Sequence, residues 1–119
     1  MRIRHSNPEL VIKALNSPVR KRILELVEIP FSRPHKLKHI LHMTYSTLNE
    51  HLRILEEAGL IGILRLGKNT LIYPKVTRID LSVRRGKLAA WYEPAEGLDG
   101  SKLLEDAVRV LYREGKRSK

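Results

Sequence analysis

The chain has 119 residues, 42% of them hydrophobic, which is enough for a single domain with its own core. It contains no cysteine, which excludes disulfides, thiolate metal sites and cysteine nucleophiles. Its 23 basic and 13 acidic residues give a net charge of +10, which favours a polyanionic partner over a generally basic soluble protein.

Other features of the sequence also limit the possible functions. No apolar run approaches the roughly 18 residues that a membrane span needs, and the start, MRIRHSNPEL, lacks the apolar core of a secretory signal. A cytoplasmic protein is therefore expected. Glycine-rich phosphate loops, apolar carboxylate pairs and triad-like signatures are missing, so neither an enzyme nor a cofactor is expected. The lack of glutamine and the 30% of charged residues favour a thermophilic source.

Capping residues and apolar periodicity predict four helices in the first half of the chain. The first two begin at Asn-Pro and Ser-Pro pairs, and the third follows Ser32 or Arg33 at a proline. The fourth begins at Thr44 and ends at Gly59, since glycine adopts the left-handed conformation at little cost. The predicted helices cover about residues 7–15, 17–28, 35–41 and 44–58.

The second half of the chain has a different pattern. Two apolar runs flank Gly67-Lys68-Asn69 and predict a β-hairpin. The segment 81–94 fits either a strand or a helix, and a loop follows it. Asp99 or Ser101 then begins a last helix that reaches about Glu114.

This order of elements predicts a mainly α fold with a small β-hairpin, a winged helix-turn-helix over residues 8–80. Residues 81–119 form a C-terminal extension with a terminal helix and a basic tail. In this fold the third and fourth helices cross, and the fourth presents its N-terminal half to the major groove of DNA. The hairpin then reaches the phosphate backbone or the minor groove.

Three stretches resemble one family, the ArsR-type winged helix repressors. ALNSPVRKRILELV (residues 14–27) resembles the family's opening signature, and TYSTLNEHLRILEEAGLI (44–61) resembles its recognition helix. LRLGKNTLIYPK (64–75) occupies the place of the wing. The resemblance implies a homodimeric transcription regulator that binds an inverted repeat in double-stranded DNA. It also gives Arg20 a counterpart in the family, with a role in folding or dimer packing.

The sequence departs from the family pattern at several positions. His42 occupies a turn that usually contains glycine, and Glu50 replaces a common Arg or Lys. The stretch 32–38 has no cysteine pair, and no histidine follows His51, so metal sensing of the family's known kinds is not expected. His35, His39 and His42 share one helical spacing, but without a nearby carboxylate they indicate a polar face rather than a metal site.

The expected DNA-binding residues are polar or basic and lie in three parts of the chain. Those of the fourth helix offer hydrogen bonds to base edges or phosphates, and the alternative is an ordinary solvent face. The cations of the third helix and the wing suit phosphates or the minor groove. The set is Thr44, Tyr45, Ser46, Thr47, Asn49, Glu50, His51, Arg53, Lys36, Lys38, Arg65, Lys68 and Asn69.

Three interpretations of Glu50 are open. Its carboxylate can accept a hydrogen bond from cytosine, form an intrahelical pair with Arg53, or repel phosphates. We favour the pair. Glu50 belongs to the acidic part of a basic chain, since residues 44–58 have a net charge of −2 while residues 1–43 have +6.

The last helix is broadly apolar for so small a domain, so it either covers the core or forms a dimer interface. The family resemblance favours dimerisation, with a contribution from the first helix. The candidate residues are Leu10, Val11, Leu103, Leu104, Ala107, Val108 and Leu111.

The predicted function is therefore that of a sequence-specific, homodimeric DNA-binding transcription regulator. One alternative is an architectural, chromatin-type protein with little sequence preference. Another is a protein-interaction winged helix without a nucleic-acid role, which the positive charge outside the recognition helix disfavours.

Overall fold

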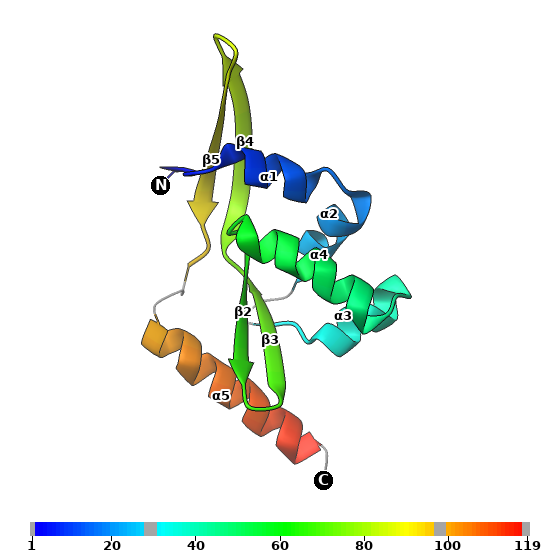
Figure 1. The fold of residues 1–119 in the computed structure, drawn as a ribbon. Coiled ribbons are helices and arrows are strands. Elements are labelled where there is room, and N and C mark those ends of the chain that lie inside the picture. The colour runs from blue at the N-terminus through cyan, green and yellow to red at the C-terminus, as the bar shows by residue number, and fades with distance from the viewer. Residues whose placement is uncertain (1, 28–30, 97–99, 118–119) are drawn as a thin grey trace.

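The structure, a computed structural model, describes residues 2–27, 31–96 and 100–117. Within them, the first four helices form one side of the molecule, the last helix lies apart from them, and two antiparallel sheets extend in opposite directions (Figure 1). The elements in chain order are β1 (Ile3–Arg4), α1 (Pro8–Leu15), α2 (Pro18–Leu26), α3 (Pro34–Leu41), α4 (Tyr45–Glu57), β2 (Ile61–Leu66), β3 (Asn69–Pro74), β4 (Val76–Arg84), β5 (Lys87–Pro94) and α5 (Gly100–Arg117).

The starts of the first four helices agree with the cap signals. The Ser17 hydroxyl accepts a hydrogen bond from the Arg20 backbone N–H, and the Thr44 hydroxyl accepts one from that of Thr47, both at 3.2 Å. Arg33, rather than Ser32, is the N-cap of α3. The end of α2 differs from the prediction: the helix ends at Leu26, because Val27 is already extended. Glu28, the predicted end, lies outside the described residues.

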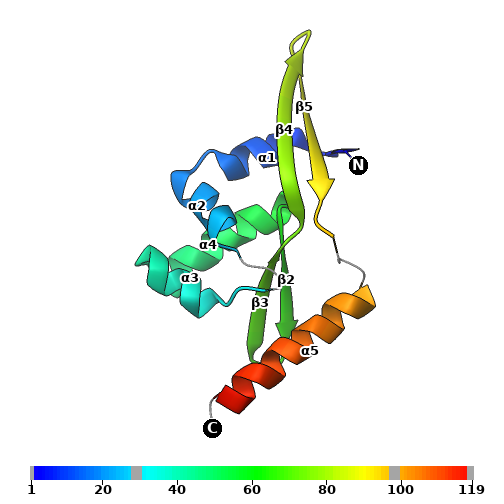
Figure 2. The same ribbon diagram turned by 180° about the vertical axis from the view of Figure 1, so that it is seen from behind.

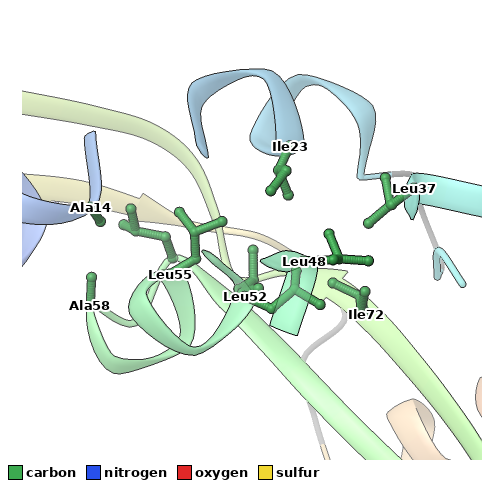
Figure 3. Packing of buried hydrophobic residues seen from close by; sticks show 10 residues of the cluster. Ala14, Ile23, Leu37, Leu48, Leu52, Leu55, Ala58 and Ile72 are labelled. Atoms are coloured by element: carbon green, nitrogen blue, oxygen red, sulfur yellow. The ribbon is translucent and has the colours of Figure 1, made fainter. Parts of the chain in front are cut away.

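The apolar faces of α1 to α4 meet in one core. Ile23, Leu48 and Leu55 are fully buried there, and Leu37 of α3 and Ile72 of the wing close it from two sides (Figure 3). Truncating one such leucine to alanine costs about 2–5 kcal/mol. The core therefore holds α4 firmly by its inner face and leaves the opposite face exposed.

The predicted hairpin is β2–β3, with Ile63 opposite Ile72 and Leu66 opposite Asn69. Gly67 has φ +61, as the first position of a type II′ turn requires. Ser32 adds an unpredicted short pairing, because its backbone exchanges hydrogen bonds of 2.7 and 2.8 Å with Ile72. This pairing fixes the chain directly before α3 to the edge of the wing.

The segment 81–94, which fitted strand or helix equally, is extended. β4 and β5 form a long hairpin, and β1 pairs with β5, giving the order β1-β5-β4. Arg85 and Gly86, at φ +53 and +75, make the two-residue turn at its tip. The predicted domain boundary at residue 80 falls inside β4.

α5 lies across the outer face of the wing (Figure 2). Leu64, Leu71 and Tyr73 point toward it, while Ile63 and Ile72 point toward the helical core. α5 begins at Gly100, one residue before the predicted cap Ser101, and continues to Arg117, past the predicted end at Glu114. Asp99, the alternative cap, lies outside the described residues.

Candidate nucleic-acid interface

The crossed pair α3 and α4 is joined by a tight turn at His42. This residue has φ +53 and ψ +52, the left-handed conformation that the family usually assigns to glycine. The turn directs the N-terminal half of α4 out of the core, so that Tyr45, Ser46, Thr47 and Asn49 are all exposed. Thr44 and Glu50 are also exposed, which makes this half of α4 a continuous polar surface.

A groove of about 570 Å³ separates α4 from the wing. Five of the predicted residues line it: Tyr45, Asn49 and Arg53 from α4, and Arg65 and Lys68 from the wing. The other predicted residues, which include Lys36 and Lys38 of α3, do not line it. The groove therefore brings amide and hydroxyl groups, which are able to hydrogen-bond base edges, together with cations, which are able to bind phosphates.

Tyr45 is held in place by α3. Its hydroxyl lies 3.0 Å from His35 Nδ1, and Lys38 Nζ lies 4.9 Å from the centre of its ring. The ring is still 45% exposed. Lys38 is therefore positioned to support Tyr45 as well as to contact a phosphate.

Glu50 forms the predicted pair with Arg53. The Arg53 guanidinium donates hydrogen bonds to Glu50 and, at 2.6 Å, to Glu57 one turn further on. The hydrogen bonds and the charge of Arg53 lower the pKa of the Glu50 carboxyl. The two carboxylates thus pair with the only cation of α4.

His51 has a structural contact that the sequence did not indicate. Arg20 donates to the Ala14 and Lys13 carbonyls at 2.8 and 2.9 Å, and its Nη1 lies 3.2 Å from His51 Nδ1. Burial and the Arg20 charge lower the pKa of His51. A neutral ring with Nδ1 as the acceptor fits these contacts, so Arg20 joins α1, α2 and α4.

The two wing cations differ in whether another side chain pairs with them. Arg65 lies 3.9 Å from Glu56 and is 65% exposed, a pair too long and too hydrated to hold it firmly. Lys68 is exposed at the turn and has no ion pair within the described ranges. Lys68 is thus the wing cation most available to a phosphate.

Arg33, a groove residue that the sequence did not single out, connects three elements. Its Nη2 donates to Asn69 of the wing at 3.2 Å, and its Nη1 lies 3.3 Å from Glu114 of α5. Asn69 is therefore occupied by a side-chain contact and half-buried. Only the three-dimensional packing of α5 could have revealed this connection.

The predicted dimerisation residues divide into two groups. Val11 and Ala107 are fully buried within the single chain, and Leu10, Leu103 and Leu111 pack at the edges of the two cores. Leu104 and Val108 are 48% and 57% exposed, and Tyr112, which the sequence did not single out, is 64% exposed. These three residues form a second apolar stripe on the outer side of α5.

The described part of the chain contains neither a cluster of metal ligands nor a helix that could span a membrane. No group of three His, Cys, Asp or Glu side chains is placed to hold a metal ion there. Over the same residues, no helix has both the length and the apolar character of a membrane span.

The fold and the groove define a class: α3, α4 and the β2–β3 wing form a winged helix-turn-helix. Residues 17–62 match the family model described as "Bacterial regulatory protein, arsR family", the same family that the motifs of this stretch resemble. The crystal structure of an ArsR family transcriptional regulator has 15% identity and a TM-score of 0.46, over 96% of this chain and 97% of that one. This TM-score is too low to support an argument. Comparison with curated proteins gives no match.

Proposed function

We propose that the protein is a sequence-specific, homodimeric transcription regulator of double-stranded DNA. α4 enters the major groove, and the wing contacts the backbone or the minor groove. The observation that carries the proposal is the groove between α4 and the wing, where Asn49 and Tyr45 lie opposite Arg65 and Lys68. Amide and hydroxyl groups distinguish base edges, whereas cations fix the register on the phosphates.

The charge distribution supports separate roles within this surface: α4 selects the sequence, and the cations around it attract DNA. Arg53 is neutralised by Glu50 and Glu57, so the exposed turns of α4 offer uncharged hydrogen-bonding groups. Attraction to DNA then comes from the wing, α3 and the remaining basic surface. Such a distribution favours selective binding over binding to any phosphate backbone, because only base contacts depend on sequence.

The outer stripe of α5 is our candidate for the dimer contact. Leu104, Val108 and Tyr112 recur every four residues, so they share one face, and the opposite face already covers the wing. A second copy is the occupant we propose, because two-fold contact of such stripes would bury both at once. The two recognition helices would then enter successive major grooves about 34 Å apart.

Selection of bound sequences from a random duplex pool tests the proposal. We expect an enriched inverted repeat with half-sites about one helical turn apart. An unenriched pool, bound with an affinity that falls steeply with salt, would favour an architectural protein. Absence of binding even at low salt would favour a protein-interaction domain.

A further inference from the structure

The β4–β5 hairpin lies outside the winged helix-turn-helix formed by α3, α4 and the wing. One of its faces is strongly basic. Arg4 and Trp91 are directly paired across β1 and β5, as are Asp80 and Trp91 across β4 and β5. The alternation of a strand places Arg2, Arg78, Arg84 and Lys87 on the same side. With Arg85 in the turn, six cations stand against the two anions Asp80 and Glu93, a net charge of +4 out of the chain's +10.

Part of this charge is compensated and part is free. Asp80 lies 3.1 Å from Arg78 and 3.9 Å from Arg2. Arg84, Arg85 and Lys87 are exposed, and none of them has an ion pair in the described part of the chain. The free cations are therefore concentrated at the tip, which extends beyond every helix (Figure 1).

The turn at the tip uses an unfavourable residue. A two-residue turn with positive φ at both positions prefers Asn, Asp or Gly at the first one, yet the chain has Arg85 there at φ +53. Residues in sparsely populated backbone conformations cluster at ligand-binding and active sites. An arginine at the tip adds a planar guanidinium, which binds phosphate oxygens in a bidentate manner.

The other end of the face has an aromatic residue between two arginines. The guanidinium carbons of Arg2 and Arg4 lie 5.5 and 6.0 Å from the centre of the Trp91 ring, and a shallow hollow opens beside Arg2 and Trp91. Guanidinium groups stacked on an aromatic ring keep their N–H donors directed outward. Trp91 is also the only tryptophan of the chain, so its fluorescence reports on this face alone.

We propose that this face, together with the Arg84–Lys87 tip, is a second DNA-binding surface that takes the phosphate backbone of duplex DNA. A two-stranded ribbon is narrow enough to follow a groove, and its cations release counterions as they neutralise phosphates. The tip lies at the opposite end of the molecule from the tip of the wing (Figures 1 and 2). The hairpin therefore holds a different duplex segment from the one in the recognition groove of the same subunit.

A charge-removal variant tests the tip. Arg84→Ser, Arg85→Asn and Lys87→Thr remove three charges, and asparagine suits the positive φ better than arginine, so the hairpin should still form. The control removes three exposed charges elsewhere: Lys21→Ser, Lys102→Ser and Arg113→Ser.

Fluorescence anisotropy with a 30-bp random-sequence duplex over a salt series compares the DNA affinities of the two variants. The tip variant should lose at least tenfold in affinity at low salt and two to three units of salt slope, at about 0.9 unit for each phosphate contact. A loss no larger than that of the control overturns the proposal.

Trp91 fluorescence separates this surface from the recognition groove. The same duplex should change the emission in the wild type and equally in an Asn49→Ala/Lys68→Ala variant, whose hairpin is intact. Failure of the proposed function would remove sequence preference but leave this signal, so the two outcomes are distinguishable. No change with duplex, or a change only with vesicles of phosphatidylserine, overturns the proposal; the second result would indicate a lipid surface instead.

Discussion

Uncharged side chains occupy the exposed start of α4, and three arginines near this helix are held by partners. Arg53 is shared by Glu50 and Glu57, Arg33 by Asn69 and Glu114, and Arg20 by backbone carbonyls and His51. The same residue type thus serves three purposes, and only the contacts distinguish them. Each role can be tested at the level of the single side chain.

Asn49 should determine selectivity. Its amide is exposed and lines the groove, and a carboxamide can form two hydrogen bonds with adenine. Asn49→Ala should relax discrimination at one base position by about 1–3 kcal/mol, measured by competition among single-base variants of a selected duplex. A uniform loss over all these duplexes would instead make Asn49 a backbone contact.

Lys68 should contribute affinity without selectivity. It is exposed at the wing turn and contacts no carboxylate in the described residues. Lys68→Ala should weaken binding evenly over all sequences and reduce the salt slope by about one unit. An unchanged slope in a salt titration would remove the tip of the wing from the interface.

His51 should make stability depend on pH. Burial and Arg20 lower its pKa in the folded state below the ordinary value of 6.5, so the unfolded chain binds the proton more readily. The His51 contribution to the free energy of unfolding is therefore full above about pH 6.5 and declines as the pH falls toward the folded-state pKa. Urea unfolding from about pH 7 to 5 should give a shallower decline for His51→Gln than for the wild type. Equal slopes would contradict the assignment.

At the scale of elements, α5 has two apolar faces with different partners. Ala107 is fully buried against Phe31 and Leu71, whereas Leu104 and Val108 remain exposed. Gly62 belongs to the same arrangement, because the Tyr73 ring covers it and leaves no room for a Cβ. The inner face therefore packs on the wing, and the outer face stays exposed.

Leu104→Glu should weaken the dimer without unfolding the subunit, since Leu104 is half exposed in the single chain. Burying a leucine contributes about 1.5–3 kcal/mol, so dimerisation should weaken at least tenfold in sedimentation equilibrium. Lys102→Glu is the matched control, because it places the same carboxylate on the same helix outside the stripe. Identical behaviour of the two variants would exclude this stripe from the interface.

The local signals of the sequence were sufficient for the helices and the wing. Ser17, Thr44 and Gly59 determine helix ends through contacts within a few residues, and these predictions are confirmed. The strands at 76–94 could not be predicted. Their inner face packs on α1, but much of the half near the tip is exposed. The apolar residues of this segment therefore do not alternate regularly with polar ones. The contacts of Arg33 with Glu114 and of His5 with the Ala58 carbonyl join residues more than fifty positions apart, which no local pattern encodes.

At the scale of the whole molecule, the two hairpins point in opposite directions along a body 59 Å long. The wing frames the recognition groove, and the basic β4–β5 hairpin extends from the other end. All of the positive net charge lies outside α4, since residues 44–58 have −2 within a chain of +10. We therefore propose that attraction to DNA and selection of a sequence depend on different parts of the surface.

The central claim, selective DNA binding through the α4–wing groove, is tested most directly by competition between a selected duplex and a scrambled duplex of equal length at increasing salt. Base contacts do not release counterions, so the ratio of the two affinities should stay well above unity while both affinities decline. The ratio should fall for Asn49→Ala but hold for Lys68→Ala. A wild-type ratio near unity at every salt concentration would contradict the account.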